Sequence, residues 1–361
     1  MVRRSRTRAG VTLLEVLVAI FVMAIGMLAI LTLFPLGAIN MAQAIKDDRT
    51  RQTADQADAF MRMYWLNSVA TLPGTPNRDD MLANSLANPN LVPPDPFPSV
   101  PLANNQLKYG TTPEVFPPVA IASQPSYPVL IDPLAFFAEA PGGQPRFWVA
   151  RGSTNAGLLI PRRNLNIAIP PNIPPSTPAI ISQLAVQTCC MVDDMTFHEN
   201  GSPDPGLLRQ GRYSWAVMLR RPQSSQPNTA TMTILVFEGR PPLLATPGDE
   251  VMLQGAANVS VTGTRTINLM VPTRTTEQTP LIRKGGWILD GTIDPAAGIR
   301  NANFYRIAGV TEGTPDPATG RTPFALDLQT DLKPTSGTPQ IYLFAGLSEV
   351  FERPPLTAAT Q

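Results

Sequence analysis

The chain has 361 residues, enough for one to three domains with a substantial core, and its 43% hydrophobic content excludes a largely disordered protein. Charged residues make up only 15%, against about 25% in an average globular protein, whereas the 40 prolines are roughly twice the usual share. Without the four arginines of the first ten residues, 24 basic residues face 27 acidic ones. The net charge then falls from +1 to −3, which excludes the electrostatic footprint of a nucleic-acid-binding protein.

The first predicted element is a membrane-spanning helix. Val16 to Leu36 is a run of 21 residues without a charge. At about 1.5 Å per residue, a helix of that length spans roughly 30 Å, the thickness of the hydrocarbon core of a bilayer. Because four arginines precede the run, the N-terminus should stay in the cytoplasm and the rest of the chain should lie outside. No second run of this length follows. The sequence therefore predicts a single-pass protein with its transmembrane segment at about 14–36.

Two ordinary kinds of N-terminal segment share these features. A cleaved secretory signal also begins with basic residues, but its apolar middle holds only about 7–15 residues before a small-x-small cleavage site. Ala42-Gln43-Ala44 fits such a site, but the apolar run before it is too long. An ordinary signal anchor has a suitable length. Neither kind of segment explains why a carboxylate, Glu15, stands where the apolar run begins.

The residues around Glu15 resemble a known signal. Gly10 to Ala19 reads GVTLLEVLVA, and this is similar to the class III signal of type IV prepilins and type II secretion pseudopilins. Those proteins have a short basic leader ending in Gly, then a hydrophobic residue, then Thr-Leu-(Leu/Ile)-Glu at the start of the membrane helix. The sequence TLLEVLVA followed by AIGML is most similar to the minor-pilin branch that includes the type IV pilus modification proteins. Val11 stands where Phe is most common.

The resemblance implies a particular processing route. A prepilin peptidase in the membrane would cut between Gly10 and Val11 on the cytoplasmic side and would then methylate the new amine of Val11. Residues 1–10 would be the leader peptide. Unlike ordinary signal cleavage, this cut leaves the apolar helix on the mature protein.

Glu15 has a physical role in such a protein. A carboxylate within a transmembrane segment is costly and is usually paired and functional. Glu15 lies about one helical turn from the new N-terminus. We expect it to pair with the terminal amine of a neighbouring subunit and so to fix the axial register during subunit assembly. The alternative is a carboxylate at the headgroup boundary that is paired with the leader arginines.

Beyond the apolar run, the helical pattern continues. Pro35 removes one helix hydrogen bond and predicts a kink, although a proline where a helix leaves the membrane would be equally ordinary. Apolar residues recur at helical spacing until Leu72-Pro73-Gly74 ends the pattern. We therefore expect one N-terminal helix over 11–70, or two helices joined by a turn near Pro35.

The following segment, 71–180, holds 22 of the 40 prolines. It is predicted to be an irregular, proline-rich part of the head with strands at Val129–Ile131 and Phe147–Val149.

Strand signals dominate the segment 181–361, which is predicted to be a β-rich domain. Tyr213, Trp215, Val217 and Leu219 alternate along the first strand and should share one face. The expected strands are Arg212–Arg220, Thr231–Glu238, a hairpin over Asn258–Val271 that turns at Gly263-Thr264, Trp287–Leu289, Phe304–Val310, Phe324–Leu328 and Ile341–Phe351. The predicted fold class is α+β, with a long N-terminal transmembrane and amphipathic helix packed on a C-terminal antiparallel sheet or small barrel.

No catalytic constellation is evident. His198 is the only histidine, and the sequence has no zinc-protease, nucleophile-elbow, redox-dithiol or phosphate-loop motif. Gly313 to Thr322 has the wrong spacing for a nucleotide loop, and its prolines lack the N–H donors that phosphate needs, so we interpret it as a turn. The two cysteines, Cys189 and Cys190, are adjacent, which excludes a disulfide framework.

Asp193, Asp194 and Glu199 could supply oxygen ligands to Ca²⁺. Their spacing matches no recognised calcium loop, so carboxylates in a loop without a metal are the preferred interpretation. We predict no catalytic residue, no metal and no cofactor.

The sequence thus predicts a structural protein and not an enzyme: a minor pilin or pseudopilin. It would be inserted in the cytoplasmic membrane, with its head in the periplasm, and would assemble into a type IV pilus or a type II secretion pseudopilus. Its partners would be the prepilin peptidase, other pilin or pseudopilin subunits and inner-membrane lipid, with no nucleic acid. Two alternatives are a membrane-anchored surface or binding protein that is processed in this way without entering a filament, and an extracellular enzyme on a signal anchor.

Overall fold

The fold is taken from a computed structural model that describes residues 13–70, 82, 86, 125–126, 128–132, 162–163, 213–223, 228–240, 250–273, 281–294, 299–333 and 337–358. Only the backbone is described at 29–34, 36, 162–163, 250 and 293. The chain divides into two compact units, Met1–Arg51 and Gln52–Gln361. The predicted strand at Phe147–Val149 lies outside the described residues.

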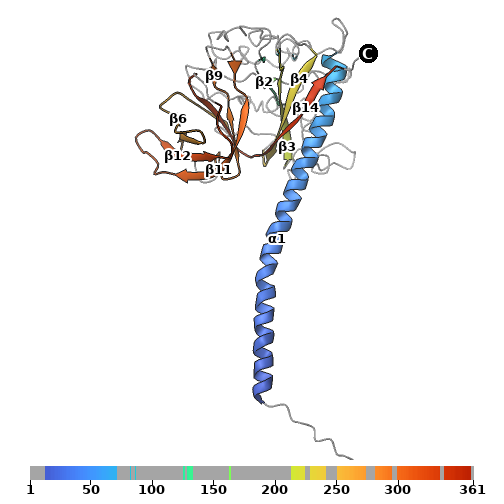
Figure 1. The fold of residues 1–361 in the computed structure, drawn as a ribbon, viewed down its shortest axis with the longest axis vertical. Coiled ribbons are helices and arrows are strands. Elements are labelled where there is room, and N and C mark those ends of the chain that lie inside the picture. Colours follow the sequence, from blue (N-terminus) through green and yellow to red (C-terminus); the bar gives the residue numbers. More distant parts are fainter. Residues whose placement is uncertain are drawn as a thin grey trace, which may run out of the picture. The chain divides into compact units, whose positions relative to one another are not determined.

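One helix opens the described chain (Figure 1). Helix α1 runs from Leu13 to Tyr64, and a short π-helical turn, η1 (Trp65–Val69), follows it. The backbone N–H of Ala70 donates to the carbonyl oxygen of Trp65 at 2.8 Å and closes this wider turn. Trp65 and Val69 are thereby both buried. The helix is continuous through Pro35, so the alternative of two helices joined by a turn there is wrong.

A five-stranded sheet packs against the second half of this helix, and we call it the helix-bound sheet. Its strand order is β14-β4-β3-β1-β2, antiparallel except for the parallel pair β1 and β2. The strands are β1 (Val129–Ile131), β2 (Arg162–Arg163), β3 (Tyr213–Arg220), β4 (Thr229–Glu238) and β14 (Leu347–Thr357). One core joins Ala57, Met61 and Trp65 of the helix segment to Trp215 and Ile234 of the sheet. Beyond Arg51, the apolar side of the amphipathic helix is therefore buried against the helix-bound sheet.

Contacts at the edge strand β14 add polar links to the helix. Arg62 donates to the carbonyl oxygen of Pro354 at 2.8 Å, and Arg353 lies 2.5 Å from the carboxylate of Asp55. Proline lacks a backbone donor and suits an edge strand, where no further strand needs that donor. The helix side chain thus occupies backbone acceptors that the sheet leaves open at this edge.

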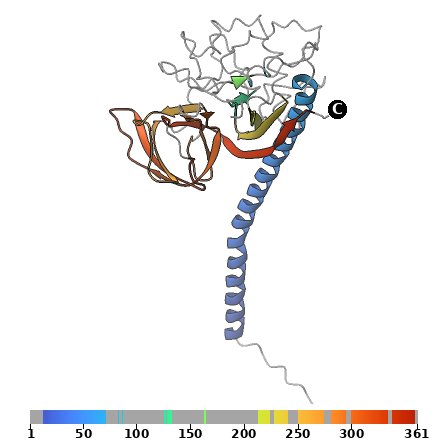
Figure 2. The ribbon, with the colours of Figure 1, turned by 45° about the horizontal axis from the view of Figure 1, so that its top comes forward.

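A seven-stranded antiparallel sheet forms the other half of the head, and we call it the curled sheet. Its order is β5-β13-β8-β11-β12-β7-β6, and the sheet is curved, as the orange strands in Figure 1 and Figure 2 show. Among the described residues, one buried apolar cluster is formed by its strands and loops. The strands are β5 (Glu250–Gln254), β6 (Val259–Val261), β7 (Thr266–Pro272), β8 (Trp287–Asp290), β11 (Asn303–Glu312), β12 (Arg321–Leu328) and β13 (Gln340–Phe344). A small hairpin, β9 (Ile293–Asp294) and β10 (Ile299–Arg300), accompanies it.

The two sheets meet along a second apolar layer. Ala216, Leu235 and Phe237 of the helix-bound sheet are in one buried cluster with Leu289 and Tyr342 of the curled sheet. The helix-bound sheet is therefore covered on both faces, by α1 on one side and by the curled sheet on the other. This explains why β3 is buried along almost its whole length.

Most of the predicted strands are confirmed. Tyr213, Trp215, Val217 and Leu219 do share one face, which points into the helix-side core. The hairpin between β6 and β7 turns at Gly263, whose φ of 95° favours glycine. The segment before Arg321 is a loop between β11 and β12, as the turn interpretation predicted. The α+β class with a β-rich C-terminal region is confirmed.

One strand prediction is wrong. Ile341–Phe351 is not a single strand, because β13 ends at Phe344 and β14 begins at Leu347 in the other sheet. Between them, Gly346 adopts a φ of 75° that turns the chain from one sheet into the other.

Candidate functional site

The predicted processing and assembly site lies at the start of α1. Gly10 and Val11 are outside the described residues, and the helix begins at Leu13. Glu15 is in the first helical turn, where the positive end of the helix dipole favours a carboxylate. Around it the apolar side chains are exposed, with 80% of Leu13 and 70% of Leu14 accessible. Exposed apolar patches often mark interaction sites. A partner that packed against this patch would also have to neutralise or solvate the carboxylate of Glu15.

Glu15 also lines a shallow hollow on the helix surface. The other described residues of its lining are Val16, Ala19, Ile20 and Met23, which all lie on one side of α1. Glu15 is the one charged residue among them. Between Glu15 and Met23, the side of the helix that carries the carboxylate is therefore otherwise apolar.

None of the helices in the described part of the chain has a stretch whose length and hydropathy suit a bilayer crossing. Part of the predicted span at about 14–36 falls on 29–34 and 36, whose side chains lie outside the description. The transmembrane segment and the kink at Pro35 both stay predictions.

A buried polar network in the head was not predicted from the sequence. Arg300 of β10 is 1% exposed, and its guanidinium donates to the carbonyl oxygen of Gly291 and to Oε1 of Gln340, each at 3.0 Å, and to the hydroxyl of Tyr342. The carbonyl oxygen of Arg300 in turn accepts a hydrogen bond of 2.8 Å from Arg220, whose pKa burial lowers to about 10. These bonds connect the β9–β10 hairpin to both sheets.

Asp290 carries the negative charge of this network. Its carboxylate accepts hydrogen bonds from the backbone N–H and the hydroxyl of Thr292, at 2.9 and 2.5 Å, and from Nδ2 of Asn301 at 3.0 Å. Burial raises the pKa of the Asp290 carboxyl above its ordinary value near 3.8, and these hydrogen bonds together with the charge of Arg300 oppose that rise. The network is satisfied internally, so it supports the fold and does not offer a ligand site.

The pKa of Asp290 leads to a testable pH dependence. Because the folded-state pKa is raised, the folded protein holds this proton more tightly. The resulting stabilisation is fully present below the unfolded-state pKa near 3.8 and is lost as the pH rises through the folded-state pKa. The Asp290→Asn variant lacks this ionisation. We expect the stability advantage of the unmodified chain over Asp290→Asn to shrink as the pH rises from about 4. Urea unfolding across that range measures it, and an advantage that grows with pH would contradict the prediction.

A buried ion pair lies directly after the end of β1. Both terminal guanidinium nitrogens of Arg240 donate to the carboxylate of Asp132, with 3.0 Å between Nη1 and Oδ1, and the two side chains are 5% and 0% exposed. Arg240 also lies over the ring of Phe237, 4.4 Å from its centroid. Asp132→Ala would leave a buried arginine without this partner and should cost about 3–5 kcal/mol of stability, which thermal or urea unfolding would measure. Loss of less than about 1 kcal/mol would contradict this expectation.

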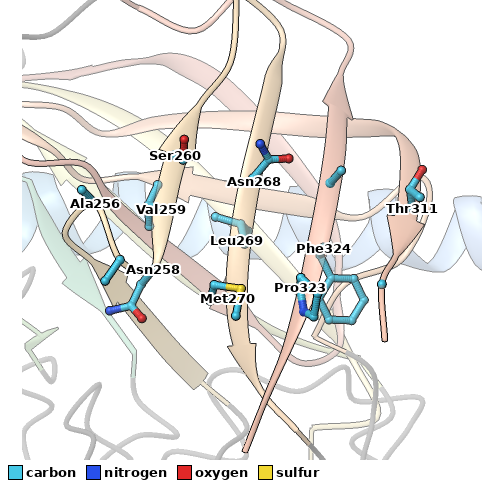
Figure 3. A pocket seen from close by; sticks show the side chains of 13 residues that line it. Ala256, Asn258, Val259, Ser260, Asn268, Leu269, Met270, Thr311, Pro323 and Phe324 are labelled. Atoms are coloured by element: carbon cyan, nitrogen blue, oxygen red, sulfur yellow. The ribbon is translucent and has the colours of Figure 1, made fainter. Parts of the chain in front are cut away.

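A shallow hollow of about 260 Å³ lies on the exposed side of the curled sheet (Figure 3). Ser260, Asn268, Met270 and Pro323 line it with Thr311, and none of its described lining residues is titratable. Ligand pockets usually hold about 300–1,000 Å³. The hollow is smaller than that, and its described lining offers no acid or base that could activate the hydroxyls of Ser260 and Thr311.

The candidate metal ligands lie elsewhere. The candidate calcium ligands Asp193, Asp194 and Glu199 are outside the described residues, and so are Cys189, Cys190 and His198. Within the ranges that are described, no group of three histidine, cysteine or acidic side chains could hold a metal ion.

Comparison with known proteins identifies the N-terminal segment. Residues 5–31 match the family model described as the prokaryotic N-terminal methylation motif, the class III signal of type IV pilins and pseudopilins. No curated protein and no solved structure matches the chain. The predicted resemblance is thus confirmed at the level of this signal, while the minor-pilin branch stays a prediction. The motif marks a pilin-type structural precursor, and it implies processing by a prepilin peptidase and a membrane-associated, pilus-related location.

Proposed function

We propose that this chain is a minor pilin or pseudopilin. In this proposal the leader is cut between Gly10 and Val11, Val11 is methylated, and the segment at about 14–36 crosses the cytoplasmic membrane once. The head then lies in the periplasm, and the helix assembles with other subunits into a type IV pilus or a type II secretion pseudopilus. The observation that carries the proposal is the methylation motif at residues 5–31, which overlaps the start of α1.

The first turn of α1 supports a role for Glu15 in assembly. Its carboxylate stands among exposed apolar residues, and leader removal would place a positive amine about one turn away in each subunit. When such helices pack side by side, the amine of one subunit can neutralise the carboxylate of the next. This ion pair would then stabilise one axial register of neighbouring helices relative to the others.

The size of the head supports a special position in the filament. A five-stranded and a seven-stranded sheet are formed by the chain that follows the helix. We propose that such a head suits a filament tip or an adapter better than a repeating shaft.

Analysis of the N-terminus of the protein from native membranes tests the proposal. Intact mass and N-terminal sequencing should give a chain that begins at methylated Val11. Retention of Met1, or a start at Ile45 after the small-x-small site, would contradict it.

Isolated filaments separate the two functions that share this processing. A filament subunit is found in purified filaments, whereas a membrane-anchored binding protein that only borrows the processing route is absent from them.

A further inference from the structure

The curled sheet is inserted between two paired strands of the helix-bound sheet. Its seven strands, together with the small β9–β10 hairpin, all lie between the end of β4 at Glu238 and the start of β14 at Leu347. Yet β4 and β14 pair directly with one another, with Leu347 opposite Phe237. The chain therefore leaves the helix-bound sheet and returns to it at neighbouring positions.

A hydrogen bond closes the base of this insertion. The backbone N–H of Glu238 donates to the carbonyl oxygen of Gly346 at 2.7 Å. Chain ends that lie close together are the usual geometry of an inserted domain, because the host needs only a short connection in its place. Without the insertion, β4 and β14 would form an ordinary antiparallel hairpin.

The two parts also have separate cores. Leu326, Ile307 and Ile288 belong to the core of the curled sheet, and none of the described side chains of α1 or of the helix-bound sheet is a member of that cluster. Ile234 and Trp215 belong to the core that includes the helix. The shared layer between the sheets, described above, is a third cluster in which residues of both parts meet.

We propose that the curled sheet is a module inserted into a host made of α1 and the helix-bound sheet, and that the host alone carries what the chain needs to enter a filament. The curled sheet would then take no part in assembly and would be free to make other contacts. The first half of this inference stands on topology and packing. The second half rests on the proposed function.

Two matched core substitutions in the full-length purified chain test the inference. Leu326→Ala opens a cavity in the module, and Ile234→Ala opens one in the host, where both side chains are wholly buried. For Leu326→Ala, native-state hydrogen exchange should become about 30-fold faster or more in β7, β11 and β12. Exchange in β3 and β4 should change by less than about threefold. Ile234→Ala should accelerate exchange in β3 and β4.

A milder substitution guards against failure to fold. Ile307→Val, in the same core as Leu326, should accelerate exchange in the curled sheet by about 2- to 10-fold and leave β3 and β4 unchanged. If either module variant accelerates exchange in β3 and β4 by the same factor as in its own strands, the head is one cooperative unit and the inference is overturned.

Filament content separates this inference from the proposed function. Leu326→Ala should enter filaments at the unmodified level, and Ile234→Ala should enter less. Loss of Leu326→Ala from filaments that still contain the unmodified chain would overturn the second half alone. Absence of the unmodified chain from filaments would overturn the proposed function and that second half with it, whereas the exchange result would still decide the first.

Discussion

Replacing Gly346 with alanine should lower the free energy of unfolding by about 3 kcal/mol or more. Gly346 has a φ of 75°, which costs any residue with a Cβ atom roughly 1–2 kcal/mol. A Cβ there would also lie 2.5 Å from the carbonyl oxygen of Glu238, a backbone atom that cannot move without disturbing β4. The hydrogen bond from Glu238 to Gly346 lies at the same point, so relief of the clash would weaken the base of the insertion.

Gly239 provides the matched control for this substitution. It lies next to Glu238 and has a similar φ of 70°, but a Cβ there would meet nothing within 4 Å. Gly239→Ala should therefore cost only the conformational part, about 1–2 kcal/mol. Urea unfolding of both variants, followed by tryptophan fluorescence, gives the comparison. If both variants lost the same free energy of unfolding, the added Cβ at Gly346 would meet no lasting clash. The turn at Gly346 between β13 and β14 would then be able to adjust.

The strand pattern of β3 shows what the sequence could predict. Residues Tyr213 to Leu219 alternate so strongly that their common face followed directly. The residues between them, among them Ala216 and Met218, are apolar or small as well, which is typical of a strand buried on both faces. That second signal was present, but it does not say which partner covers the other face. The partner proved to be a sheet from a distant part of the chain.

The crossing at Gly346 shows where local patterns fail. The apolar residues on either side of it form one continuous strand signal, and a single glycine within such a signal indicates a bulge as readily as a change of sheet. Pairing decides the matter, because Phe344 lies opposite Glu250 and Leu347 opposite Phe237. Such pairing depends on contacts about 100 residues apart, which no periodicity encodes.

Buried charges were equally hidden from the sequence. Arg300 and Asp290 lie in segments that read as ordinary turn and strand ends, and composition cannot tell a buried arginine from an exposed one. The opposite holds at the N-terminus. There Gly10, Glu15 and the uncharged run follow one another in a short linear segment, so the match to the methylation motif depends on no contact between distant residues.

Glu15→Ala should reduce incorporation of the chain into filaments by about tenfold or more while leaving its processing and its amount in the membrane unchanged. If Glu15 pairs with the terminal amine of a neighbouring subunit, its loss leaves that amine without a counter-charge in an apolar setting. Breaking a buried pair on one side usually costs about 3–5 kcal/mol, enough for a tenfold change even when solvent and lipid headgroups relieve much of it. The carboxylate of Glu15 also stabilises the first turn of α1 by its interaction with the helix dipole, but that contribution is only about 0.3–1 kcal/mol.

Two further variants decide whether the charge or the side chain matters. Glu15→Gln keeps the shape but removes the charge and should behave like Glu15→Ala, because only a carboxylate neutralises an amine fully. Asp47→Ala removes a carboxylate from the same helix in its charged segment, and it should leave incorporation within about twofold of normal, as expected for an exposed surface charge. Quantitative immunoblots of purified filaments against the membrane fraction give these ratios. Normal incorporation of Glu15→Ala into filaments would contradict the proposed pairing of Glu15 with the terminal amine of a neighbouring subunit.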